Sequence, residues 1–270
     1  MYNTTGNHPI LKIRIALFVA GFMLLASSVL TGCGTSGQPM LADMMNVLPA
    51  ETDSLFLIRS DMPETIPDFS DTWHTLTEQT LPPGTSPASL GIASRHGNLT
   101  GLCYTFDGET PSFPAASGEQ VEIGGFTVTR TDNFWDSFTL GTVLVVSVKD
   151  YTEEIITGHQ ESAVTMSAAF QDIPGHLPDG IFQAAVKDLD IGGKKANLLI
   201  SLAKDKDSGY AAVTGFFSTA DGTTELIESY LARCSVTNIS LTDENGWTKV
   251  SGLLDPADFS SLMDGLTPKN

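Results

Sequence analysis

Basic side chains are scarce in this sequence, which has 14 Lys and Arg residues against 32 Asp and Glu residues in 270 positions. Lys12 and Arg14 precede Cys33 and no acidic residue does, so residues 33–270 carry a net charge of about −20. Such an excess of negative charge repels phosphate backbones and anionic lipid headgroups. We therefore expect no nucleic acid among the partners of this protein.

Cysteine and histidine are also rare, and their spacing excludes the common metal and redox motifs. The sequence has 3 Cys and 5 His residues, no two histidines lie within one helical turn of each other, and neither Cys-x-x-Cys nor His-Glu-x-x-His occurs. The sequence also lacks the Gly-x-Ser-x-Gly nucleophile motif and the P-loop. It therefore predicts no metal site and no bound cofactor, and it assigns no catalytic residue.

Long apolar runs are missing as well, except for one at the N-terminus. Residues 1–14 are mostly polar and include Lys12 and Arg14, and residues 15–30 contain no charged side chain. A cationic segment followed by an apolar segment is typical of a secretory signal peptide. The run is shorter than the roughly 20 residues that cross a bilayer as a helix, so a permanent transmembrane helix is the weaker alternative.

The sequence Leu30-Thr31-Gly32-Cys33 follows this run and resembles the lipobox of bacterial lipoproteins. The resemblance implies that residues 1–32 are a signal peptide cleaved between Gly32 and Cys33, and that the Cys33 thiol carries a diacylglyceryl group. Two or three acyl chains anchor a protein stably, whereas one chain does so only marginally. We therefore expect contact with the membrane through this lipid, on the extracytoplasmic side of the cell membrane or at the outer membrane.

The remaining sequence divides into a short tether and a folded domain. Residues 33–39 are rich in Gly, Ser and Thr and end with Pro, as in a flexible linker. In residues 40–270, patterns typical of strands alternate with patterns typical of helices. The predicted strands are 55–58, 98–106, 121–131, 134–140, 142–148, 181–186, 197–203, 210–218, 236–242 and 247–253. The predicted helices are 40–48, 69–81, 221–232, 257–266 and one from residue 150 to about 170, with a break near Gly158. This order predicts an α+β fold of antiparallel sheets with helices packed on one face.

One order of elements, a Leu-Pro turn followed by a strand, a strand pair and a helix, occurs twice. The two copies divide the domain into halves, 40–172 and 173–270, and suggest a degenerate duplication of one strand-strand-helix unit. The alternative is an ordinary α+β chain that contains no duplication. Residues 48–61 and 167–188 resemble segments of a family of uncharacterised exported bacterial proteins, often membrane-anchored. That resemblance implies no activity.

Cys103 and Cys234 are the two thiols that remain after lipidation. In an oxidising envelope they could form a disulfide that closes a loop of about 130 residues. Cys103 lies in a predicted strand, and Cys234 continues the apolar positions of a predicted helix, so both could equally be small buried residues. The sequence leaves these two alternatives open.

Four other patterns suggest chemistry but have a simpler structural interpretation. The Ser-x-x-Lys spacing of Ser201 and Lys204 falls at a strand end, and Asp205–Gly209 reads as a hairpin tip rather than a calcium loop. Residues 192–195 read as a turn rather than a phosphate loop. The three tryptophans are expected in the core or at its rim rather than in a sugar platform.

These observations predict a lipid-anchored cell-envelope protein that acts as a non-catalytic binding or interaction module. Its protein or small-molecule partner is not identified by the sequence. One alternative is an envelope hydrolase whose site is assembled from distant residues. Another is a solute-binding protein of a transporter, which would have two lobes around a cleft.

Overall fold

The computed structural model describes residues 41–62, 68–111, 118–131, 134–160, 165–205, 209–218 and 224–267. The predicted signal peptide, lipobox and tether therefore lie outside the described residues. The domain itself begins at α2 (Leu41–Val47), a short helix whose residues Leu41, Met44 and Met45 are buried. Among the described residues, no helix has both the length and the apolar character that crossing a membrane requires.

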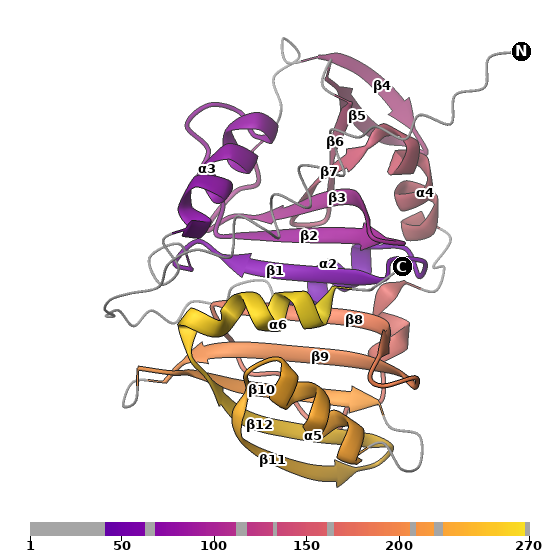
Figure 1. The fold of residues 1–270 in the computed structure, drawn as a ribbon. Coiled ribbons are helices and arrows are strands. Elements are labelled where there is room, and N and C mark those ends of the chain that lie inside the picture. Colours follow the sequence, from indigo (N-terminus) through magenta and orange to yellow (C-terminus); the bar gives the residue numbers. More distant parts are fainter. Residues whose placement is uncertain are drawn as a thin grey trace, which may run out of the picture.

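A single sheet of 12 strands runs through the described residues, and every neighbouring pair in it is antiparallel. The order across the sheet is β11-β12-β10-β9-β8-β1-β2-β3-β7-β6-β5-β4. Figure 1 shows this sheet with β4 at the top and β11 at the bottom. Its strands are β1 (Ser54–Arg59), β2 (Ser89–Arg95), β3 (Asn98–Thr105), β4 (Glu119–Ile123), β5 (Phe126–Arg130), β6 (Trp135–Leu140), β7 (Val143–Val148), β8 (Phe182–Asp190), β9 (Lys195–Lys204), β10 (Ala211–Ser218), β11 (Thr237–Glu244) and β12 (Trp247–Leu254).

Helices cover both faces of this sheet, so the prediction of helices on one face is wrong. Side chains alternate along each strand, and Leu102 and Tyr104 of β3 therefore join one hydrophobic cluster while Cys103 joins the other. The first cluster contains residues of α3 (Asp68–Thr80), α5 (Thr224–Arg233) and α6 (Phe259–Leu266). The second contains residues of α2, α4 (Lys149–Gln160) and the 3₁₀ helix η2 (Met166–Phe170). Two covered faces explain why β7 reads as an almost continuous apolar run rather than an alternating one.

The two predicted halves share this sheet, because β1 and β8 lie side by side at its centre. The strand order β1-β2-β3-β7-β6 in the first half has a counterpart, β8-β9-β10-β12-β11, in the second. The helices break this likeness, since α4 follows β7 on one face and α6 follows β12 on the other. A duplication is therefore not confirmed, and the halves form one continuous sheet rather than two lobes.

Most predicted elements are present, and three predictions are wrong. Strand β2 is absent from the predicted elements, and residues 121–131 form the hairpin β4–β5 around Gly124 and Gly125 instead of one strand. The predicted long helix ends at Gln160, and residues 166–170 form η2. The Asn245-Gly246 hairpin and the cap that Asp255 supplies before the last helix agree with the sequence.

Candidate functional site

The residues that carry the predicted anchoring chemistry, Gly32 and Cys33, lie outside the described residues. Cys103 and Cys234 are described, and both are free, buried thiols. They belong to the hydrophobic clusters on opposite sides of the sheet, so the sheet separates them and no disulfide joins them. The structure thus has the second alternative of the sequence analysis, in which both cysteines are small buried residues.

Burial makes both thiol environments unreactive. Desolvation raises the pKa of Cys103 to about 12, because the thiolate has no water or cation around it. Tyr104 and Tyr230 lie in the same kind of environment, and burial raises the pKa of both hydroxyls. The Tyr104 hydroxyl is hydrogen-bonded to Thr80 of α3 at 2.7 Å, so it fastens this helix to β3.

The only fully buried carboxyl group among the described residues is that of Asp136, and it organises a polar cluster. Asp136 (β6), Ser147 (β7), Thr152 (α4) and Arg130 (β5) form this group, which we call the Asp136 cluster. The Thr152 hydroxyl donates to Asp136 Oδ2 at 2.9 Å and is also hydrogen-bonded to Ser147 Oγ at 2.7 Å. Arg130 Nε lies 3.8 Å from Asp136 Oδ1, close enough for an ion pair, but neither atom has a hydrogen bond.

The chemistry of the Asp136 cluster is structural in its present geometry. A hydroxyl–hydroxyl–carboxyl chain could activate a nucleophile, but Ser147, Thr152 and Asp136 are each at most 1% exposed. A substrate therefore has no access to Ser147. A buried carboxyl group is costly unless it is paired and hydrogen-bonded, and Thr152 supplies that hydrogen bond from α4. The cluster fixes the start of α4 against β6 and β7.

The sequence analysis missed this cluster, although a signal for it is present. Asp136 lies between Trp135 and Ser137 inside a predicted strand, where an unpaired carboxyl group is disfavoured. Its partners Ser147 and Thr152 flank the start of the following helix. Spacing alone does not show that these three residues meet, because the contact depends on the pairing of β6 with β7.

A second group of polar side chains lies where β2 turns into β3. The backbone N–H of His96 donates to Asp53 Oδ2, and the imidazole Nδ1 lies 3.8 Å from the same oxygen. Next to it, Arg95 Nη1 donates to Glu154 Oε1 of α4 at 2.7 Å. All four side chains are at least partly exposed, so each ion pair contributes at most about 1 kcal/mol.

The four other sequence patterns have the structural roles that the sequence favoured. Ser201 and Lys204 lie three residues apart in β9, so they point to opposite faces, and Ser201 Oγ donates to the carbonyl of Pro178. Asp205 and Tyr210 pair across the hairpin between β9 and β10. The backbone N–H groups of Gly193 and Gly192 bind Asp190 and lower its pKa, as in a tight turn. Trp73 and Trp247 are buried on opposite faces of the sheet.

Metal ligands do not gather in the part of the chain that the structure describes. No group of three His, Cys, Asp or Glu side chains in these residues could hold a metal ion. The polar groups that do meet, in the Asp136 cluster and around Asp53, contain one and two carboxylates respectively.

Comparisons with known proteins give two solved structures with a related arrangement. Crystal form I of TP0453 matches with a TM-score of 0.44 and 9% sequence identity, over 83% of this chain and 97% of that chain. Crystal form IV of TP0453 matches with a TM-score of 0.44 and 9% identity, over 81% of this chain and 95% of that chain. No protein-family model matches the sequence, and no curated protein matches it.

Proposed function

We propose that this protein is a lipid-anchored component of the bacterial cell envelope that acts as a non-catalytic binding or interaction module. The observation that carries the proposal is the order of the first 33 residues, in which Lys12 and Arg14, an uncharged apolar run and Leu30-Thr31-Gly32-Cys33 follow one another. Cleavage before Cys33 and acylation of its thiol place the folded domain on the extracytoplasmic side, at the cell membrane or the outer membrane.

The start of the folded domain supports this arrangement. The first described helix begins at Leu41, so residues 34–40 separate it from Cys33. Extended, these residues span at most roughly 25 Å. A tether of this length holds the domain close to the bilayer while leaving it free to turn, which suits a protein that meets its partners at the membrane surface.

The non-catalytic part of the proposal is supported by where the reactive groups lie. Ser147, Thr152 and Asp136, the hydroxyl and carboxyl groups that the fold brings together, are buried and hydrogen-bonded to one another. The exposed strand surfaces carry polar and acidic side chains instead, as in β4 and β11. Such surfaces suit protein contacts and, with a net charge of about −20, disfavour nucleic acid.

Intact-mass measurement of protein extracted from membranes tests the anchor. The parent chain is expected to begin at Cys33 and to carry the mass of its acyl chains, whereas Cys33→Ser is expected to keep residues 1–32 and carry none. Cys103→Ala serves as the control, because it removes a different cysteine and should leave the acyl mass unchanged. A parent chain with an uncut leader and no lipid would contradict the proposal.

Activity screening tests the absence of catalysis. The full chain is incubated with panels of ester, peptide and glycoside substrates, and no turnover above the buffer rate is expected. Turnover that a single substitution abolishes would replace this proposal with the envelope hydrolase.

We also infer that the two halves of the sheet derive from a degenerate duplication. The support is the shared strand order on either side of the β1–β8 pair, and the opposite placement of α4 and α6 counts against it. Superposing β8, β9, β10, β12 and β11 from a crystal structure on β1, β2, β3, β7 and β6 tests this inference. Strand directions that fail to coincide would rule it out.

A further inference from the structure

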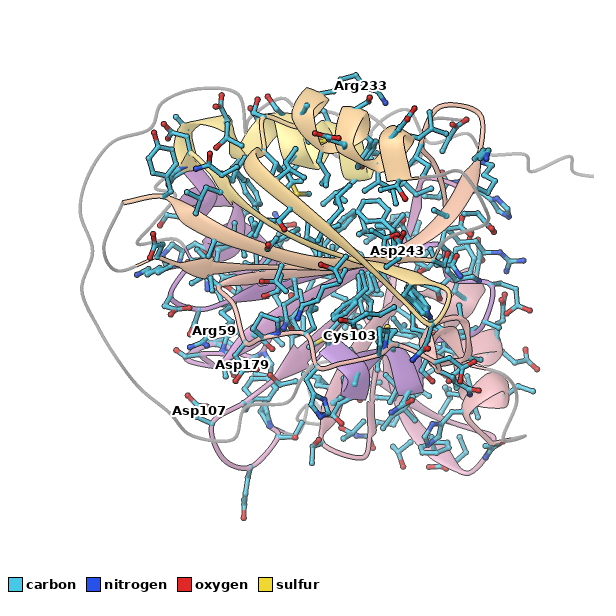
Figure 2. The ribbon with its side chains drawn as sticks, turned by 90° about the horizontal axis from the view of Figure 1, so that it is seen from below. Arg59, Cys103, Asp107, Asp179, Arg233 and Asp243 are labelled. Carbon is cyan, nitrogen blue, oxygen red and sulfur yellow. The ribbon has the colours of Figure 1, made fainter. Side chains whose placement is uncertain are left out.

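Strand β11 forms one edge of the 12-stranded sheet and pairs only with β12 among the described strands. Figure 2 views the molecule from the side of β11, with Asp243 on this strand and Arg233 at the end of α5. The turn at Asn245 and Gly246 has two residues, both with positive φ (48° and 83°), so Glu244 and Trp247 form a hydrogen-bonded pair. Hydrogen bonding alternates along the strand, and the backbone groups of Leu241 and Asp243 therefore point outward from the sheet.

The side chains along this edge change in character from one end to the other. Ile239 and Leu241, in the middle, are partly buried and pack against the same core as α5. Asp243 and Glu244 place two carboxylates at the hairpin end. Helix α5 ends at the exposed Arg233, three residues before Val236 and the start of β11, so the cation lies at the opposite end.

This distribution is self-complementary when the strand is reversed. An antiparallel copy of the same edge brings its Arg233 end toward Asp243 and Glu244, and its apolar middle against Leu241. We propose that β11 pairs with β11 of a second copy of this chain, antiparallel and about a two-fold axis at Ser240. In this register Leu241 lies opposite Ile239 of the second copy, and Asp243 lies opposite Thr237.

The other edge of the sheet does not offer the same fit. Strand β4 has five residues, of which Glu119, Gln120 and Glu122 are exposed. Pairing β4 with itself would bring four carboxylates together without a cation on the strand. At physiological salt, charges more than about 8 Å apart are largely screened, so the charges at each edge matter more than the net charge of the chain.

Cysteine cross-linking of the full chain tests this pairing, and it does not depend on the lipid anchor. Ser240 bonds inward to β12, so at the axis it forms a non-hydrogen-bonded pair with its own copy, with Cα atoms about 4.5 Å apart. That distance suits a disulfide, so Ser240→Cys is expected to give a cross-linked dimer under mild oxidation. Ser251→Cys is the matched control, because Ser251 is an exposed serine paired with Ser240 one strand further in. Its two copies would lie three strand spacings apart, about 14 Å, and should not cross-link.

The charges at the ends provide a second measurement. In the Ser240→Cys chain, Arg233→Glu is expected to weaken dimer association about 2- to 30-fold, since it removes two symmetry-related ion pairs. Lys249→Glu makes the same charge change at an exposed position on β12 and should leave association unchanged. The parent chain, with its native cysteines, is the reference for all bands.

Two results would overturn the proposal. One is a Ser240→Cys chain that yields no more dimer than Ser251→Cys. The other is a Ser240→Cys chain that cross-links to a different protein, which would make the β11 edge a site for another partner rather than for a second copy.

Discussion

Thr152 makes the two hydrogen bonds on which the buried Asp136 depends, one to the carboxylate and one to Ser147. Thr152→Val keeps the shape of the side chain but leaves both partners without this hydroxyl. We expect the free energy of unfolding to fall by about 1–3 kcal/mol, the cost of an unsatisfied buried polar group. Urea denaturation followed by circular dichroism measures this change.

Thr127→Val is the matched control for that substitution. Thr127 also donates to a carboxylate, that of Glu122 at 2.7 Å, but both residues are exposed. Water replaces the lost hydrogen bond there, and we expect a change within about 0.5 kcal/mol. Equal effects of the two substitutions would show that the Asp136 cluster does not stabilise the fold.

Cys103 predicts a pH dependence of stability. Its pKa is raised from 9.0 to about 12 in the folded state, so between these values the unfolded thiol loses its proton while the folded thiol keeps it. The free energy of unfolding therefore falls as pH rises above about 9, by up to about 1.4 kcal/mol per pH unit for this thiol. Cys103→Ala should show a shallower fall in the same range, because only the buried tyrosines then contribute. Identical slopes for parent and variant would contradict the assignment.

At the residue scale, the sequence predicted the types of environment better than the contacts. It correctly described Ser201, Asp205 and the Gly192-Gly193 turn as structural, because their local pattern determines their role. It could not choose between a disulfide and two buried thiols for Cys103 and Cys234, since that choice depends on which face of the sheet each residue lies. The Asp136 cluster was missed for the same reason, because strand pairing creates it.

Helix α2 packs closely on the sheet because Gly91 of β2 has no side chain. A Cβ atom at Gly91 would lie 2.5 Å from Met44 Sδ, 3.1 Å from Leu55 Cδ1 and 3.2 Å from Cys103 Cβ. Gly91→Ala is therefore expected to displace α2 and to lower the free energy of unfolding by about 1–3 kcal/mol. Thermal unfolding and limited proteolysis at the N-terminal side of the domain measure these two effects.

Gly101→Ala is the control at the scale of the element. Gly101 lies in the neighbouring strand β3, and a Cβ atom there would come no closer than 3.4 Å to any atom outside its own neighbours. The alanine should be accommodated without displacing a helix. A Gly101→Ala variant that loses as much stability as Gly91→Ala would remove the steric explanation.

The elements that the sequence predicted well have strong local signals. Residues 142–148 contain β-branched residues between turn signals, and the Asn-Gly turn fixes the β11–β12 hairpin. Strand β2 was missed because Ser, Gly and Ala in residues 89–95 carry little strand propensity, and its pairing with β1 and β3 supplies the stability. The β4–β5 hairpin was read as one strand because Gly124-Gly125 was not recognised as a turn.

At the scale of the whole molecule, the pairing of β1 with β8 predicts that both halves unfold together. Two variants test this, each with one of the other tryptophans retained: Trp73 alone, in α3 of the first half, and Trp247 alone, in β12 of the second. Fluorescence should report the same urea midpoint for both, because neither half can unfold without exposing the central strands. Two separate midpoints would show that the halves are independent folding units.

The overall arrangement could not be predicted from the sequence beyond its class. Antiparallel strands and short turns indicated an α+β fold, and that class is confirmed. The prediction failed on the number of covered faces, because buried residues of both clusters come from the same strands and a pattern of burial does not say which helix covers which side. It also gave no sign that β1 and β8 meet, since 122 residues separate the two strands.

The position of β1 determines how the molecule bears mechanical load. The chain enters the fold through α2 and then becomes β1, which is hydrogen-bonded on both sides, to β2 and to β8. A pull on the N-terminal segment thus acts on a strand in the middle of the sheet rather than on an outer strand that could be peeled off one bond at a time. Many hydrogen bonds must break at once in shear, so a domain tethered in this way resists forced extraction far better than one held by its edge.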